Sequence, residues 1–178
     1  MKKKVIVVLL FFVLTMSLSG CSPADPSVQG AMDFLVDIGI PEAQNETIQK
    51  SEMYAQVIID SLKNSRTKDL CNLFCEKIKT SHNIDDEILK AVEFIDGNII
   101  NDGELEHLSE AGSAWRDGEK IDSHICPQIK QVETDSGKIY NISFFAYIIY
   151  EEDTSYAGIT RITIFAEDGT SCMIGEVV

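Results

Sequence analysis

The apolar residues of this chain change their spacing at Gly97, and that change restricts the folds open to it. Before Gly97 they recur at steps of three and four, as on one side of a helix. The first such stripe consists of Met53, Val57, Ile58 and Leu62. After Gly97 they alternate, as on one face of a strand. Helices first and strands second predict an α+β domain, in which N-terminal helices pack on one face of an antiparallel sheet.

The spacing also predicts the individual elements. We expect helices over residues 47–64 and 68–79 and a third from residue 83 or 85 to Gly97, which suits the left-handed position after a helix. Strands are expected over residues 98–100, 119–133, 138–150, 158–166 and 171–177, with an irregular or briefly helical connection over residues 104–114.

The strand over residues 138–150 is apolar on both faces between residues 144 and 149. It is therefore predicted to be a central strand whose second face is covered. A helix, the chain before residue 47, or a second subunit would serve as that cover, so a homodimer is one of the expectations.

The start of the chain has the pattern of an exported lipoprotein. Lys2, Lys3 and Lys4 precede ten apolar residues, a run too short to span a bilayer. The motif Leu18-Ser19-Gly20-Cys21 resembles the lipobox of bacterial lipoproteins. That resemblance implies cleavage before Cys21, thioether lipidation of Cys21 with acyl chains such as palmitate, and attachment to the extracytoplasmic face of the cell membrane. The alternative is an ordinary signal peptide with an incidental cysteine.

These patterns divide the chain into three parts. Residues 1–20 are expected to be the signal peptide, residues 21–46 the lipidated cysteine with a flexible tether, and residues 47–178 a single α+β domain. Proline and glycine recur through the tether without a sustained helical or alternating pattern. A domain of about 130 residues is long enough for one core and too short for two.

The charge of the chain excludes one class of partner. Three of its 15 Lys and Arg lie in the signal peptide, which leaves 12 against 29 Asp and Glu and a formal charge of −17 for the mature protein. Such a surface repels phosphate backbones, so nucleic acid is not an expected partner. The acidic residues are dispersed, which favours a role in solubility.

Four cysteines remain beyond Cys21, and their sequence positions leave three alternatives open. Disulfides are permitted outside the cytoplasm, thiols also pack well in cores, and zinc would need a closer pairing of the two strand cysteines. Two of the four are expected to share a face of the second helix. The cysteines are Cys71, Cys75, Cys126 and Cys172.

Several short motifs along the domain form a familiar pattern. They are Asp69 with Phe74, Phe94-Ile95-Asp96-Gly97, Arg116-Asp117-Gly118, Tyr140-Asn141-Ile142 and Gly158-Ile159. Over residues 49–175 the chain resembles the uncharacterised bacterial lipoproteins grouped as domain of unknown function 5104. The order of helices and strands is similar to the cone-shaped fold of nuclear transport factor 2 and the cystatin-like proteins. This likeness implies a curved sheet with a pocket between it and the helices, and it carries over no catalytic residue.

Few residues suggest chemistry. His82, His107 and His124 have no metal-ligand spacing and are expected to be solvated, and neither a metal site nor a cofactor is predicted. Trp115 and Arg116 are candidate contacts for a ligand or partner, although Trp115 covering the end of the core is the competing interpretation. The remaining candidate contacts are Tyr140 and Tyr147.

The sequence therefore favours a binding or interaction module over an enzyme. The expected partners are the membrane, through the lipid, and an unknown small molecule or envelope protein. The alternative is a small isomerase or hydrolase that uses a buried carboxylate in the pocket, with tyrosine as the proton donor.

Overall fold

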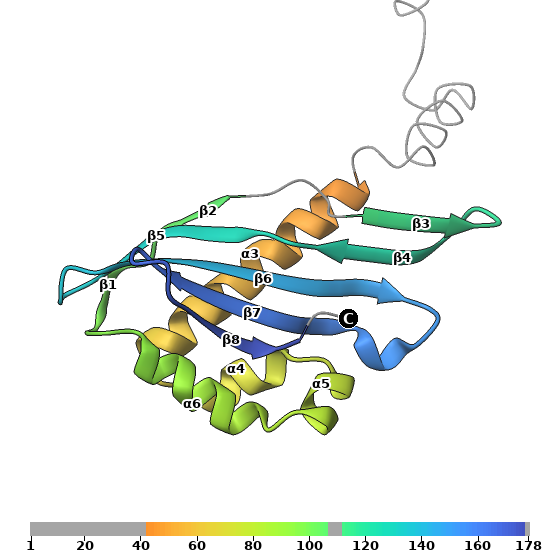
Figure 1. Cartoon of the computed structure of the whole chain (residues 1–178). Coiled ribbons are helices and arrows are strands. Elements are labelled where there is room, and N and C mark those ends of the chain that lie inside the picture. Colours follow the sequence, from red (N-terminus) through yellow and green to blue (C-terminus); the bar gives the residue numbers. More distant parts are fainter. Residues whose placement is uncertain (1–41, 107–111, 177–178) are drawn as a thin grey trace, which may run out of the picture. The chain divides into compact units, whose positions relative to one another are not determined.

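The computed structural model describes residues 42–106 and 112–176. The chain divides between Asn45 and Glu46 into two compact units, and the second unit, residues 46–178, contains the sheet. Within the described residues, four α-helices precede eight strands (Figure 1). The predicted α+β class, with helices before the sheet, is confirmed.

The helices begin and end close to the predicted positions, with one extension. The first helix starts at Glu42, inside the expected tether, where a proline precedes it and acidic residues favour a helix N-terminus. The last helix ends at Phe94 with an extended Ile95 as its C-cap, so Gly97 is left-handed as predicted, with a φ of +91°, but lies beyond the C′ position expected for it. The bounds are α3 Glu42–Lys63, α4 Thr67–Leu73, α5 Glu76–Ser81 and α6 Ile84–Phe94.

The single helix expected over residues 68–79 is wrong, because the chain is extended at Phe74 and Cys75. Phe74 forms a parallel bridge with Ile159, and the Cys75 N–H donates to the Ile159 carbonyl at 2.9 Å. The chain therefore exchanges helical hydrogen bonds for bonds to a strand, which separates α4 from α5. Cys71 and Cys75 consequently do not share one helical face.

The strands form one eight-stranded sheet with antiparallel pairing between the strands. They are β1 Ile99–Asn101, β2 Glu104–Glu106, β3 Gly112–Arg116, β4 Glu119–Ile125, β5 Gln128–Thr134, β6 Ile139–Tyr150, β7 Gly158–Ala166 and β8 Ser171–Gly175. The central strand is β6, which pairs with β7 along one edge and with both β4 and β5 along the other. The central position predicted for residues 138–150 is confirmed.

The strand predicted over residues 119–133 is divided into β4 and β5 at Cys126 and Pro127. The register nevertheless continues across the division, since Ile125 lies opposite Ala146 and Gln128 opposite Ser143. Pro127 has no N–H for the ladder, but its carbonyl accepts a hydrogen bond from Phe144 at 3.2 Å.

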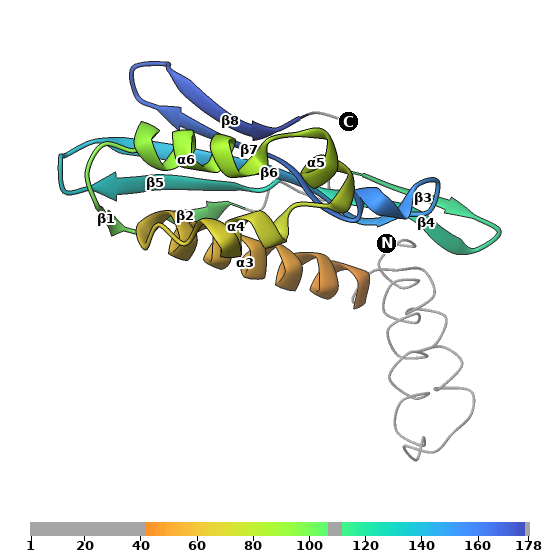
Figure 2. The same ribbon diagram turned by 90° about the horizontal axis from the view of Figure 1, so that it is seen from below.

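The irregular connection predicted over residues 104–114 is also wrong. Strand β2 pairs with β5, and β3 pairs with β4 in a hairpin that projects at one end of the sheet (Figures 1 and 2). The residues of β3 after Gly112 are all exposed, so no apolar alternation marks them as a strand.

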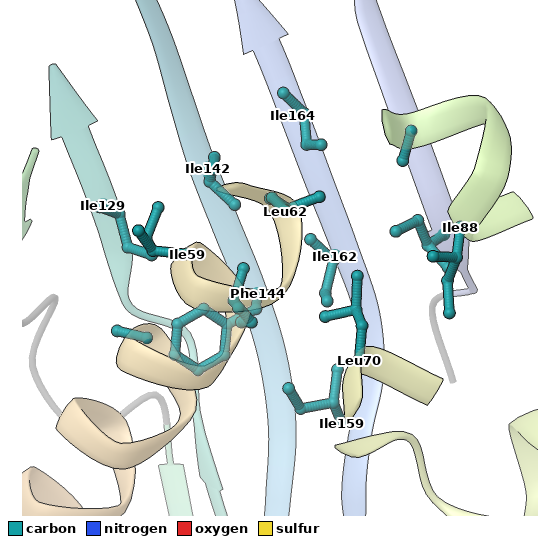
Figure 3. Close-up of a cluster of buried hydrophobic side chains, with 14 of the residues drawn as sticks. Ile59, Leu62, Leu70, Ile88, Ile129, Ile142, Phe144, Ile159, Ile162 and Ile164 are labelled. Carbon is teal, nitrogen blue, oxygen red and sulfur yellow. The ribbon is translucent and has the colours of Figure 1, made fainter. Parts of the chain in front are cut away.

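The hydrophobic core lies between the helices and one face of the sheet. Helix α3 runs behind β5 and β6 in Figure 1 and below them in Figure 2. Figure 3 shows Ile59, Leu62, Leu70 and Ile88, from three helices, pointing toward the sheet residues. The sheet residues labelled there, Ile129, Ile142, Phe144, Ile159, Ile162 and Ile164, are all buried.

The second face of the sheet is partly covered by its own aromatic residues. Phe145 and Tyr147 of β6 pack against the His124 ring, at centroid distances of 5.1 and 5.6 Å. Farther along, Phe165 of β7 and Met173 of β8 are 41% and 52% exposed. Near His124, the helices cover one face of β6, and packing among its own aromatic residues and His124 covers the other. The homodimer stays a prediction.

Candidate functional site

A hollow of about 200 Å³ lies between α3 and strands β2 and β5. Residues at helical steps of three and four along α3 form one wall, and Leu105 and Ile129 of the strands form the other. The α3 residues are Glu52, Ala55, Gln56 and Ile59. Ala55, Ile59 and Ile129 are buried and form an apolar floor, whereas Glu52 and Gln56 are exposed at the rim.

A tight turn between β1 and β2 completes the rim. The Gly103 N–H donates to Asn101 Oδ1 at 3.1 Å, and Asp102 accepts a hydrogen bond from Lys63 Nζ at 2.8 Å. Gly103 has a φ of +76°, and a Cβ there would lie 2.4 Å from the Lys130 carbonyl oxygen, so only glycine fits. The turn thereby holds Asp102 at the mouth of the hollow and ties the end of α3 to the sheet.

The residues of the hollow suit binding better than proton transfer. Its two carboxylates, Glu52 and Asp102, are exposed, and Asp102 is paired with Lys63. No tyrosine or histidine is found among the described residues that line it. A buried carboxylate beside a tyrosine or histidine, which the enzyme alternative requires, is therefore not what this hollow presents.

Trp115 and Arg116 lie near the end of the β3–β4 hairpin. Trp115 is 52% exposed, with Lys120 Nζ 5.5 Å from its ring centroid. The interpretation that Trp115 covers the end of the core is therefore wrong. Its position on a projecting hairpin is compatible with the predicted contact role, although it does not line the hollow.

Tyr140 is 2% exposed and ties the end of α6 to the sheet. Its hydroxyl accepts a hydrogen bond from the Asp96 N–H at 2.9 Å and donates to the Phe94 carbonyl at 3.4 Å. Both bonds satisfy backbone groups at the helix end. This geometry assigns Tyr140 a structural role, and its predicted role as a ligand contact gains no support.

Tyr147 belongs to an aromatic cluster on the second face of the sheet, at the end near the hairpin. Its ring centroid lies 4.6 Å from that of Tyr150 and 6.4 Å from that of Tyr156. Burial raises the pKa of Tyr147, and the charge of Asp122 raises it further. Tyr147 is 9% exposed, so mainly the edges of the cluster face solvent.

The expectation of a solvated His124 is wrong. Its Nδ1 lies 2.9 Å from Asp122 Oδ1, and its ring lies over Gly112, where a Cβ would approach within 2.8 Å. Asp122 and His124 are two residues apart on one strand, which places them on the same face. The two-residue spacing is the sequence signal from which the contact between Asp122 and His124 could have been predicted. His107 lies outside the described residues.

All four cysteines of the domain are free thiols in the structure. Burial raises the pKa values of Cys71, Cys75 and Cys172, which favours the protonated form. This arrangement matches the alternative of packed thiols, and disulfide formation stays a prediction. Across residues 42–106 and 112–176, no group of three or more His, Cys, Asp or Glu is placed to hold a metal ion.

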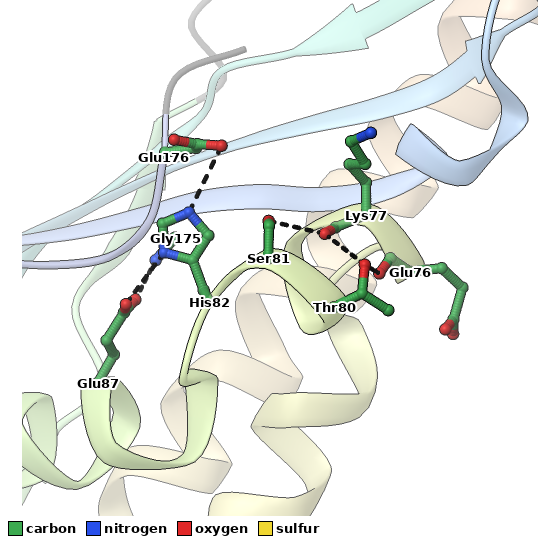
Figure 4. Close-up of polar contacts among 8 residues, drawn as sticks. All are labelled: Glu76, Lys77, Thr80, Ser81, His82, Glu87, Gly175 and Glu176. Atoms are coloured by element: carbon green, nitrogen blue, oxygen red, sulfur yellow. Dashed lines mark hydrogen bonds and ion pairs between the residues drawn. The ribbon is translucent and has the colours of Figure 1, made fainter.

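His82 joins the start of α6 to the end of β8, and solvation is again the wrong expectation (Figure 4). Its Nδ1 lies 3.1 Å from Glu87 Oε1, and its Nε2 lies 3.5 Å from Glu176 Oε1. The other oxygen of Glu87 accepts a hydrogen bond from the Gly175 N–H at 2.8 Å. The hydrogen bond to Glu87 raises the pKa of His82, against the opposing effect of burial.

Replacing His82 by glutamine is expected to cost more stability in acid than in mild base. A raised pKa in the folded state means that His82 stabilises the fold fully below the unfolded pKa of about 6.5, and that this contribution is lost as the pH rises through the folded pKa. We expect the loss in unfolding free energy at pH 5.5 to exceed that at pH 8 by about 0.5–1 kcal/mol. Urea unfolding of both proteins at the two pH values measures it. An equal loss at both would contradict the ion pairs.

None of the helices in the described part is long and apolar enough to cross a membrane. A family model with the description "Domain of unknown function (DUF5104)" matches residues 57–167, from α3 to the turn after β7. No curated protein matches the chain.

Proposed function

The chain belongs to the family of the domain of unknown function DUF5104, and we propose that it is a lipid-anchored, extracytoplasmic binding module. The hollow between α3 and the sheet is its binding site. The observation that carries this proposal is an apolar floor beneath an exposed polar rim. Pockets of this composition hold small molecules by burying their apolar part and orienting their polar groups.

The finer fold assignment is part of the same proposal. Helices on one face of an antiparallel sheet, with a hollow between α3 and that sheet, support a likeness to the cone of nuclear transport factor 2 and the cystatin-like proteins. That likeness implies a pocket between the sheet and the helices, and the hollow beside α3 supports this expectation.

The charges at the rim restrict the ligand. Glu52 and Asp102 are carboxylates, and Lys63 offsets only one of them. An anionic ligand would meet this rim and the formal charge of −17 on the mature protein. We therefore propose a neutral or cationic small molecule with an apolar part.

The proposed anchor rests on the first 21 residues. Cleavage before Cys21 and acylation of its sulfur would leave the domain tethered to the outer face of the membrane. The basic start, the short apolar run and the Leu-Ser-Gly-Cys motif support this part of the proposal. A tethered domain meets ligands at the cell surface.

Filling the hollow tests the binding proposal. Ala55 is buried at its floor, and we expect Ala55→Met to occupy the space and to remove a bound ligand. The protein is purified gently from the cell envelope, and native mass spectrometry compares its mass with that of the denatured chain. Wild-type protein is expected to carry an added mass that Ala55→Met lacks.

The same substitution at an exposed position is the matched control. Ala114 lies on β3, is exposed and does not line the hollow, so Ala114→Met should keep the added mass. Retention of the ligand by Ala55→Met would place the site elsewhere. Absence of any small molecule in wild-type protein, with an envelope protein captured instead, would replace the small-molecule proposal by a protein partner.

A further inference from the structure

A second hollow, of about 310 Å³, lies between the last turns of α3 and the short helix α4. We call it the α3–α4 groove. Three of its lining residues lie on α3, and the other three are the residue before α4 and two residues of α4. Within each set the residues are spaced so that they lie on one side of the helix. The residues are Val57, Asp60, Ser61, Arg66, Asp69 and Asn72.

The groove exists because of how α3 ends. The Arg66 N–H donates to the Ser61 carbonyl at 2.8 Å and the Ser65 N–H to the Leu62 carbonyl at 3.4 Å. Ser65 has a φ of +51°, the left-handed conformation that accompanies this pair of bonds at helix ends. The chain thus turns back, and α4 begins beside the last residues of α3.

Ser61 carries a hydroxyl with no partner. It is 2% exposed, and its Oγ forms no hydrogen bond with any of the residues that the structure describes. Other helical hydroxyls return to their own backbone: Ser51 Oγ donates to the Thr47 carbonyl at 2.9 Å, and Ser81 Oγ to the Lys77 carbonyl at 2.8 Å. A buried hydroxyl without a partner costs stability, and such groups occur where a ligand or water completes the bond.

The other side chains of the groove restrict the class of ligand that could bind beside Ser61. Arg66 Nη1 lies 3.6 Å from Asp69 Oδ2, so these two charges largely offset each other, and Asp60 leaves the groove unsuited to anions. Val57 is the one apolar residue in the lining, and the aliphatic parts of the polar side chains add further apolar surface, which the C–H groups of a ligand can cover. The remaining groups offer donors and acceptors in mixture.

We propose that the α3–α4 groove binds a neutral sugar and that the Ser61 side chain, whose Oγ is buried before binding, turns to hydrogen-bond one of the sugar hydroxyl groups. A sugar hydroxyl both donates and accepts, as does the serine hydroxyl, and the Asp60 and Asp69 carboxylates accept while the Arg66 and Asn72 side chains donate. The site is separate from the hollow between α3 and the sheet. The proposal of sugar binding therefore does not depend on the proposal that a ligand binds in that hollow.

Ser61→Ala tests the groove with two readouts. Full-length protein in phospholipid nanodiscs is titrated with N-acetylglucosamine and with its trisaccharide to about 10 mM and observed by saturation-transfer NMR. We expect transfer to the sugar protons in wild-type protein and an affinity about three- to tenfold lower in Ser61→Ala, as for the loss of one hydrogen bond. The melting temperature of Ser61→Ala should not fall, because the substitution removes a hydroxyl that has no partner.

Ser51→Ala is the matched control on the same helix. Ser51 is also buried, but its hydroxyl is bonded and lies outside the groove, so this variant should bind the sugar like wild-type protein. Asn72→Ala, at an exposed position, should weaken binding without affecting the fold. A response to the trisaccharide alone would identify a glycan chain as the source, whereas equal responses would identify free sugar.

Two results would overturn the proposal. One is the absence of saturation transfer from wild-type protein to either sugar. The other is that Ser61→Ala and Asn72→Ala both bind the sugar with the affinity of wild-type protein. If Ser61→Ala does not fold, an unchanged affinity in Asn72→Ala is sufficient to overturn the proposal.

Discussion

Replacing Phe144 by alanine is expected to lower the free energy of unfolding by about 3–5 kcal/mol. Phe144 lies in the central strand β6, is 1% exposed, and meets the Tyr54 ring of α3 edge-on at a centroid distance of 6.2 Å. Figure 3 shows it beneath α3, among aliphatic side chains of α3, β6 and β7. Removing the ring leaves a cavity that α3 cannot close without breaking its contacts at Ile59 and Leu62.

The measurement is urea unfolding followed by far-ultraviolet circular dichroism. Fluorescence of Trp115 would be a poor probe, because that side chain is 52% exposed on the hairpin. Phe165→Ala is the matched control, since Phe165 is 41% exposed on the second face of the sheet and should cost less than about 1 kcal/mol. Equal losses from the two substitutions would show that α3 does not pack on β6 as described.

The sequence predicted those parts of the fold that depend on local pattern. The apolar stripe from Met53 to Leu62 places α3, and Gly97 marks the end of the helical half at a residue that is in fact left-handed. The interruption at Phe74 was not predictable in this way. It depends on pairing with Ile159, which is far away in the sequence, and nothing near Phe74 indicates that pairing.

Short exposed strands escaped prediction for a different reason. Alternation identifies a strand only when one face is buried, and β3 is exposed on both faces from Ser113 to Arg116. Strand β2 has three residues, of which Glu104 and Glu106 are exposed, so its alternation is too brief to recognise. Their pairing with β4 and β5 becomes visible only in the assembled sheet.

The candidate sites were predicted least well. Trp115 and Tyr140 were selected for the chemistry of their side chains, yet neither lines either of the two hollows described above, and Tyr140 ties α6 to the sheet. The residues that form the two hollows are ordinary ones, such as Ala55 and Ser61. They matter because of what packs beside them, namely β2 and β5 in one case and α4 in the other.

Replacing Cys21 by serine is expected to abolish acylation and to change where the chain is cut. A serine hydroxyl cannot form a thioether, so under the proposed anchoring no acyl chain would be attached at position 21 and the domain would lack a stable anchor. The apolar run of ten residues near the start is too short to span a bilayer and would hold the uncut protein only weakly. We expect a large loss of membrane attachment, because two acyl chains are enough to hold a protein stably on a membrane and a protein without them is released.

Cells grown with an alkyne-tagged fatty acid provide the measurement. Wild-type protein should carry the tag and begin at Cys21 by mass spectrometry, whereas Cys21→Ser should carry none and retain residues 1–20 or be cut elsewhere. Cys126→Ser is the matched control, because it removes a thiol of the domain and should leave both the tag and the first residue unchanged. If Cys21→Ser is tagged, cut and sedimented with membranes like wild-type protein, the attachment does not run through this sulfur, and the domain must reach its ligands by another route.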